Sequence, residues 1–154
     1  MAKRAPGRGS RETMAKLVVR KTIRAPAERL FEAWTTPEQV QRWWGTKEIA
    51  CIGAEIDLRV GGAYRIGNQM PDGKLLWITG EFEKIEPPYE LVFTWRVEPK
   101  SNISERVTVR FEPGEDATEI IVTHERIPNV AARDQHEYGW RGCLEGMAKY
   151  LEAG

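Results

Sequence analysis

Two histidines are the residues of this chain best suited to acid–base chemistry. His124 ends a segment typical of a strand and His136 begins one typical of a helix, so the imidazoles can meet if these segments pack together. Imidazole exchanges protons near neutral pH, and Glu81 or Tyr64 could be its proton partner. The sequence shows no nucleophile beside a base and no third orienting group, and packing or hydrogen bonding at the start of a helix explains each histidine equally well. We therefore predict no catalytic residue and retain His124, His136 and Glu81 as the only candidates.

Six tryptophans provide a different chemical signal, the lining of an apolar pocket. Pockets for small molecules are lined mainly by apolar and aromatic side chains with a few polar groups. Two interpretations stay open, because rings that converge between a sheet and a helix either surround a ligand or fill the space themselves. Trp34 and Trp43 are interpreted as core. The predicted ligand-binding wall consists of Trp44, Tyr64, Trp77, Trp95, Trp140, Leu144 and Met147.

Arg59 could add a polar end to this pocket. It lies two residues after Asp57 on a predicted strand that ends in two glycines, so the two side chains share one face. A guanidinium can bind a carboxylate or phosphate head group through two hydrogen bonds. The alternative is a structural ion pair between adjacent strands. Arg59 is therefore included among the predicted ligand-binding residues, with the ion pair as the other interpretation.

Composition argues against several other classes of function. The 23 Lys and Arg residues balance 23 Asp and Glu residues, so no net charge attracts nucleic acid or an anionic membrane. The two cysteines, Cys51 and Cys143, lack partners at metal-ligand spacing, and no phosphate-binding loop, dinucleotide fingerprint or zinc motif occurs. No apolar run reaches the length of about 18 residues that a membrane span needs. We predict no metal, cofactor, nucleic-acid partner or membrane span, and expect a cytoplasmic protein because no secretory leader is present.

The segment TTPEQVQRWWG connects two short predicted helices. Proline disfavours helix in the residue before it, so the first helix ends near Thr35. Thr36 and Gln39 match a capping box around Pro37, which predicts the start of the second helix, and Gly45 supplies its stop. The two adjacent tryptophans share one apolar side of this helix with a valine, so both indoles can face the interior.

Period-two alternation predicts strands on both sides of these helices. LVVRKTI, residues 17–23, reads as one strand, and ISERVTVRFE alternates a mostly apolar face, to which Ile103 and Glu105 belong, with a polar face. Turns rich in Gly and Pro separate five or six such runs between residues 49 and 125, at a spacing typical of antiparallel hairpins. Residues 1–16 are basic, lack apolar periodicity and are predicted to be a disordered tail.

A long helix is predicted after Pro128. Its apolar stripe has a helical period and consists of His136, Trp140, Cys143, Leu144, Met147 and Leu151. Such a stripe must be buried, and the apolar face of the sheet is the natural partner. We therefore expect a single α+β domain over residues 17–152, with the helix packed on one face of a curved antiparallel sheet.

These elements and several motifs resemble one superfamily. Their order, together with APAERLFEAWTTPEQVQRWWG, DLRVGGAYR, GEFEKIEPPYELVFTW, TEIIVTHE and HEYGWRGCLEGMAKYLE, is similar to the START-like, or SRPBCC, superfamily, and within it to the branch named after the activator of heat-shock-protein-90 ATPase. The resemblance implies a helix-grip (START/Bet v 1-like) fold. In that fold a curved antiparallel sheet of six or seven strands wraps around a long C-terminal helix, two short helices follow the first strand, and a cavity lies between sheet and helix.

The superfamily implies three classes of function for this protein. The predicted function is binding of a small hydrophobic or amphipathic molecule, such as a lipid, between the sheet and the C-terminal helix. An alternative is an interaction protein that activates a chaperone ATPase, as the branch name implies, with the chaperone as its protein partner. A further alternative is an enzyme of the cyclase or hydrolase type that uses the same cavity.

Overall fold

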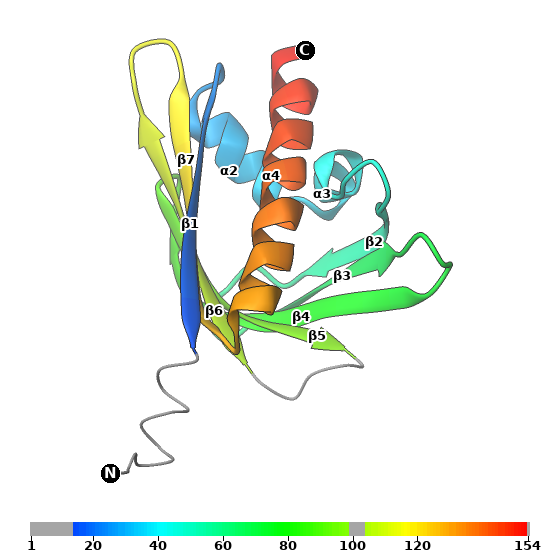
Figure 1. Cartoon of the computed structure of the whole chain (residues 1–154). Coiled ribbons are helices and arrows are strands. Elements are labelled where there is room, and N and C mark those ends of the chain that lie inside the picture. Colours follow the sequence, from blue (N-terminus) through cyan, green and yellow to red (C-terminus); the bar gives the residue numbers. More distant parts are fainter. Residues whose placement is uncertain (1–13, 99–103, 154) are drawn as a thin grey trace.

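A curved sheet of seven antiparallel strands forms the body of the protein, as seen in a computed structural model that describes residues 14–98 and 104–153 (Figure 1). The strands are β1 (Ala15–Ile23), β2 (Ala50–Ile56), β3 (Ala63–Gln69), β4 (Leu75–Glu86), β5 (Glu90–Glu98), β6 (Glu105–Pro113) and β7 (Thr118–Ile127). Their order in the sheet is β1-β7-β6-β5-β4-β3-β2, so β2 to β7 pair with their neighbours in the chain and β1 joins β7. The predicted antiparallel hairpins are confirmed.

Two short helices and one long helix pack on this sheet. The short helices α2 (Ala27–Thr35) and α3 (Pro37–Trp43) connect β1 to β2, and α4 (Val130–Ala153) follows β7 and lies along the concave side of the sheet (Figure 1). The predicted α+β helix-grip fold is thereby confirmed. Among the described residues, no helix combines the length and the apolar character that crossing a bilayer requires.

The start of α3 uses contacts that differ from the predicted capping box. The side chain of Thr36 makes no hydrogen bond to the first turn of the helix. Gln39 does not reach back to Thr36, because its Oε1 accepts hydrogen bonds from Arg29 (3.0 Å) and from the hydroxyl of Tyr150 (3.1 Å). The capping box is therefore wrong, and Gln39 connects α3 to the neighbouring helices instead. The predicted stop at Gly45 agrees with its φ of +119°, a conformation that favours glycine.

The apolar faces of the sheet and of α4 form one core. On β6, Val107, Val109 and Phe111 are fully buried, whereas Ile103, predicted to share their face, lies outside the described residues. Each aliphatic or aromatic side chain buried in this way stabilises the fold by about 1.5–3 kcal/mol. The predicted stripe of α4 is buried at Trp140, Cys143, Leu144, Met147 and Leu151.

The short helices contribute two of the six tryptophans to this core. Trp34 and Trp43 are buried, and their ring centroids lie 5.0 Å apart. The indole N–H of Trp43 donates a hydrogen bond of 2.9 Å to the carbonyl oxygen of Ala33, which joins α3 to α2. The interpretation of both rings as core is confirmed.

The first strand begins slightly earlier than predicted. β1 starts at Ala15, which pairs with Ile127 on β7, so Ala15 and Lys16 belong to the sheet and not to the predicted tail. Of the rest of the predicted tail, Met14 precedes β1 and is exposed, and residues 1–13 lie outside the described residues.

Candidate functional site

An apolar cavity of about 330 Å³ lies between the sheet and the N-terminal half of α4. We call it the inner cavity. Its wall is built by inward-facing residues of β3 to β6, by the loop after α3 and by α4. Most of the wall is apolar, and the polar groups are few. The main side chains of the wall are Trp44, Trp95, Trp140, Ile78, Val97 and His136.

Three of the predicted wall residues meet in this cavity. The ring centroids of Trp44, Trp95 and Trp140 lie between 5.3 and 6.2 Å from one another. The indole N–H of Trp44 donates to Oδ1 of Asn68 at 2.9 Å, and that of Trp140 donates to Nδ1 of His124 at 3.0 Å. The buried Nε1 of Trp95 has no hydrogen-bond partner among the described residues.

Three other predicted wall residues lie deeper in the core. Leu144 and Met147 are buried and do not line the inner cavity. They lie about one and two helical turns after Trp140, a cavity residue of α4, and other side chains of the core surround them. Tyr64 faces a much smaller space beside Trp44 and Trp95, and its hydroxyl donates to the carbonyl oxygen of Thr94. Leu144 and Met147 therefore do not line the inner cavity as predicted, and Tyr64 lines the smaller space that shares Trp44 and Trp95 with it.

Trp77 lies on the opposite face of the sheet. Its neighbour Ile78 lines the inner cavity, and successive side chains of a strand point to opposite faces. The ring of Trp77 covers Gly67, and the guanidinium of Arg65 lies 3.9 Å from its centroid. The prediction that Trp77 lines the cavity is wrong for this reason.

Arg59 also lies away from the inner cavity. β2 ends at Ile56, so Asp57 and Arg59 belong to the turn before β3 and not to a strand as predicted. Arg59 Nε donates to the carboxylate of Asp57 at 2.8 Å, and its side chain is 73% exposed. The ion pair that the sequence suggested does form, but within one turn, and Arg59 does not line the inner cavity.

The two histidines do meet, at one end of the inner cavity. Their rings are stacked, with centroids 4.5 Å apart and an angle of 13° between the planes. Their partner is Glu105, whose Oε1 lies 2.7 Å from Nε2 of His124 and 3.0 Å from Nε2 of His136. The predicted proton partners are wrong, because Glu81 is exposed on the opposite face of the sheet and the hydroxyl of Tyr64 is bonded elsewhere.

Glu105 is a member of the candidate site that the sequence did not identify. It occupies a position on the apolar face of β6, next to Val107, where a charged residue is unexpected. A carboxylate at such a position needs a buried hydrogen-bonding partner, since burial of an unpaired charge is costly. That pattern was the available signal, but it could not identify the two histidines as the partners.

Hydrogen bonding and burial determine the protonation of this cluster. Burial lowers the pKa of His124 below its ordinary value, and the hydrogen bond to Glu105 opposes this shift only in part. Burial raises the pKa of Glu105, but the hydrogen bonds from the two histidines together outweigh it, and the pKa is lowered overall. At neutral pH the cluster therefore contains a neutral His124 beside an ionised Glu105.

The cluster has the composition of a metal site, because single ligand atoms of Glu105, His124 and His136 all lie within 4.8 Å of one another. Its hydrogen bonding does not fit a bound ion. A neutral histidine that coordinates through Nε2 carries its proton on Nδ1, whereas Nδ1 of His124 accepts the N–H of Trp140. We interpret the cluster as a hydrogen-bond network, and the absence of a metal stays a prediction.

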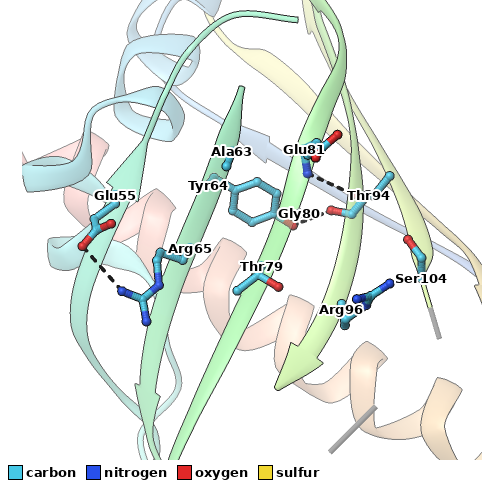
Figure 2. Close-up of a pocket in the computed structure, with 10 residues that line it drawn as sticks. All are labelled: Glu55, Ala63, Tyr64, Arg65, Thr79, Gly80, Glu81, Thr94, Arg96 and Ser104. Carbon is cyan, nitrogen blue, oxygen red and sulfur yellow. Dashed lines mark hydrogen bonds and ion pairs between the residues drawn. The ribbon is translucent and has the colours of Figure 1, made fainter. Parts of the chain in front are cut away.

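A second hollow, of about 490 Å³, lies on the face of the sheet that is turned away from α4 (Figure 2). We call it the outer hollow. Its side chains are mostly polar, and several bond to one another (Figure 2). Arg65 lies 3.6 Å from the carboxylate of Glu55, and the hydroxyl of Thr94 accepts the backbone N–H of Glu81. The outer hollow is larger than the inner cavity, and several of its polar groups bond to neighbouring groups of the sheet.

A curved antiparallel sheet closed by a long C-terminal helix over an apolar cavity defines this protein as a helix-grip protein of the START-like superfamily. The chain belongs to the family described as Activator of Hsp90 ATPase homolog 1-like protein, which matches residues 24–152. No protein with a curated description matches the chain.

Solved structures share this fold at low sequence identity. The chain is similar to a protein from Chromobacterium violaceum, with a TM-score of 0.81 and 22% identity over 89% of this chain and 96% of the other. It is also similar to an AHSA1 protein from Silicibacter pomeroyi, with a TM-score of 0.79 and 22% identity over 90% and 99%. For an AHSA1-like protein from Aeromonas hydrophila the TM-score is 0.76, with 26% identity over 90% and 93%. These likenesses concern the fold.

Proposed function

We propose that this protein binds a small hydrophobic or amphipathic molecule in the inner cavity. The observation that carries the proposal is a space of about 330 Å³ with a mainly apolar wall that includes three tryptophans. This volume lies at the lower end of the range of about 300–1,000 Å³ that ligand sites occupy. Aromatic walls of this kind favour flat or aliphatic ligands.

The indole nitrogen of Trp95 adds support to this proposal. A buried donor without a partner costs about 1–3 kcal/mol, and native proteins contain few such groups. Nε1 of Trp95 is such a donor, and its ring forms part of the cavity wall. A ligand with a hydrogen-bond acceptor would satisfy it after a small movement of the ring.

Gly139 offers a way to test the proposal by filling the cavity. It lines the inner cavity, and a Cβ added there would meet no heavy atom within 4 Å. The probe is the neutral fluorescent compound N-phenyl-1-naphthylamine, titrated into the full chain. We expect saturable binding to the wild type and, because phenylalanine occupies the ligand volume, affinity lower by about tenfold or more for Gly139→Phe.

Two matched variants control this experiment. Gly139→Ala changes the same helix position but leaves most of the cavity open, and Ala63→Phe places the same ring in the outer hollow. Both should bind the probe like the wild type, and thermal melts should show that all variants are folded. Absence of saturable binding to the wild type, or equal binding to Gly139→Phe, would overturn the proposal.

The family match supports a second candidate function, the activation of a chaperone ATPase. The family is described by its likeness to an activator of Hsp90 ATPase, and the match covers most of the chain. The direct test mixes the purified full chain with an Hsp90 chaperone and measures the rate of ATP hydrolysis. Stimulation that persists in Gly139→Phe would assign this activity to the outer surface and not to the inner cavity.

A further inference from the structure

The indole N–H of Trp140 determines the direction of the hydrogen bonds in the histidine cluster. An indole N–H can only donate, so Trp140 must donate to Nδ1 of His124. The proton of His124 then lies on Nε2 and is donated to Oε1 of Glu105. Nε2 of His136 lies 3.0 Å from the same carboxylate oxygen and donates to it as well. The chain of bonds therefore runs from Trp140 through His124 to Glu105, and from His136 to Glu105.

This arrangement leaves one imidazole lone pair available. A protonated His124 would have an N–H at Nδ1, which would oppose the N–H of Trp140 across 3.0 Å, so His124 stays neutral. Both of its ring nitrogens already have hydrogen-bond partners. His136 donates through Nε2, so in its neutral form the lone pair lies on Nδ1. No group of the described residues is bonded to Nδ1 of His136. Glu105 orients this ring as a carboxylate orients the base of a catalytic dyad.

The available lone pair belongs to a side chain that lines the inner cavity. His136 lines the cavity and its side chain is 18% exposed, whereas His124, stacked on it, is fully buried. Glu105 is the only carboxylate of the wall, and the described wall contains no Lys or Arg. The thiol of Cys143, also in the wall, stays protonated because burial raises its pKa to about 12. The wall therefore offers a base beside a negative charge and no fixed cation, an environment that disfavours an anionic ligand.

We propose that the inner cavity selects a neutral, mainly apolar molecule with a hydroxyl group, and that Nδ1 of His136 accepts the hydrogen bond of this hydroxyl. This inference rests on the proposed function and names the ligand class. Glu105 acts as a positioning residue, because it holds Nε2–H of His136 and keeps the lone pair on Nδ1. Fatty acids and other carboxylates are excluded by the negative charge of Glu105, and an apolar molecule of the same shape without a donor binds more weakly.

Two probes of nearly equal shape test this selection. 2-Naphthol carries the hydroxyl, and 2-methoxynaphthalene carries a methyl ether that cannot donate. Calorimetric titration of the full chain should show about tenfold tighter binding of 2-naphthol, the effect of one hydrogen bond to an oriented base in an apolar site. The absorption band of bound 2-naphthol should also shift to longer wavelength, since its O–H is polarised by the imidazole.

Variants assign the effect to His136. In His136→Phe the ring remains but the lone pair is lost, so the two probes should bind equally and the spectral shift should disappear. Glu105→Gln retains an oxygen acceptor for both histidines but lacks the charge that orients His136, so an intermediate preference for 2-naphthol and a smaller shift are expected. Tyr138→Phe, on the exposed side of α4, removes a hydroxyl outside the cavity wall and should behave as wild type.

The outcomes separate this inference from the function on which it rests. If both probes bind the wild type with equal affinity, the cavity binds apolar molecules but the role of His136 is refuted. The same conclusion follows if the preference for 2-naphthol persists in folded His136→Phe. If neither probe binds and N-phenyl-1-naphthylamine also fails, both proposals are refuted. Tighter binding of 2-naphthoate than of 2-naphthol would contradict the predicted exclusion of anions.

Discussion

The inner cavity and the outer hollow lie on opposite faces of the same strands and differ in size and in the chemistry of their walls. On β4, Ile78 faces the inner cavity and Thr79 faces the outer hollow. The inner wall is mainly apolar and includes an indole N–H without a partner among the described residues, whereas the outer hollow is lined mostly by polar side chains, several of which bond to one another. The larger space is therefore the poorer candidate for a ligand site. Volume alone does not define a binding site, because pockets for small molecules combine an apolar wall with a few polar groups.

The largest expected difference between the two faces concerns their tryptophans. Trp140 is almost fully buried and its N–H is bonded to His124, so Trp140→Ala should lower the free energy of unfolding by about 3–5 kcal/mol. Trp77 is only partly buried on the outer face, so Trp77→Ala should cost about 1–2 kcal/mol. Urea denaturation of both variants measures the difference. Equal losses would show that the inner face is no better packed than the outer face.

The next effect is the pH dependence of stability, which should arise on the inner face. The pKa of folded His124 lies below its ordinary value of 6.5, so below that pH the unfolded state binds more protons and stability falls as the pH is lowered. The slope is at most about 1.4 kcal/mol per pH unit for one proton. The lowered pKa of Glu105 adds a loss of the same sign below its ordinary value of 4.5.

Denaturation at pH 7.5, 6.5 and 5.5 tests this expectation. The variant His124→Gln retains a donor to Glu105 but does not titrate, so its stability should fall less steeply than that of the wild type over this range. Glu81→Gln, a change of a carboxylate on the outer face, should leave the wild-type slope unaltered. An unchanged slope in His124→Gln would contradict the assignment of a neutral, buried His124.

The smallest effect is expected in the outer hollow. Arg65 and Glu55 are 45% and 72% exposed and lie 3.6 Å apart, and exposed ion pairs of this kind contribute little to stability. Glu55→Gln should therefore change the free energy of unfolding by no more than about 0.5 kcal/mol. Binding of N-phenyl-1-naphthylamine should also be unchanged. A loss of probe binding in this variant would transfer the ligand site to the outer face.

Much of the fold was predictable because it depends on local periodicity. The alternation in ISERVTVRFE correctly identifies the buried face of β6, and the stripe through Trp140 and Met147 correctly identifies the buried side of α4. The helix boundary before Pro37 follows from the local sterics of proline. The capping box failed because the side chain of Gln39 found partners on α2 and α4, which are not local.

The candidate site was predictable only in part. Trp44, Trp95 and Trp140 were correctly expected to converge, since each lies on the apolar face of its element. Trp77 was assigned to the same wall because its residue type suits a pocket, although its phase on β4 points it outward. Residue type was an insufficient guide there. The alternation of side chains along β4, which puts Trp77 on the face opposite to Ile78, would have been the better guide.

The sequence by itself determined which residues share a face, because side-chain direction repeats every two residues in a strand and every 3.6 in a helix. It also determined that the apolar faces of the sheet and of α4 must be buried together. Only the tertiary structure decided that Glu105, His124 and His136 form one network, because they come from β6, β7 and α4. Their meeting depends on strand register and on where α4 crosses the sheet, and these are properties of the packed molecule that no local pattern encodes.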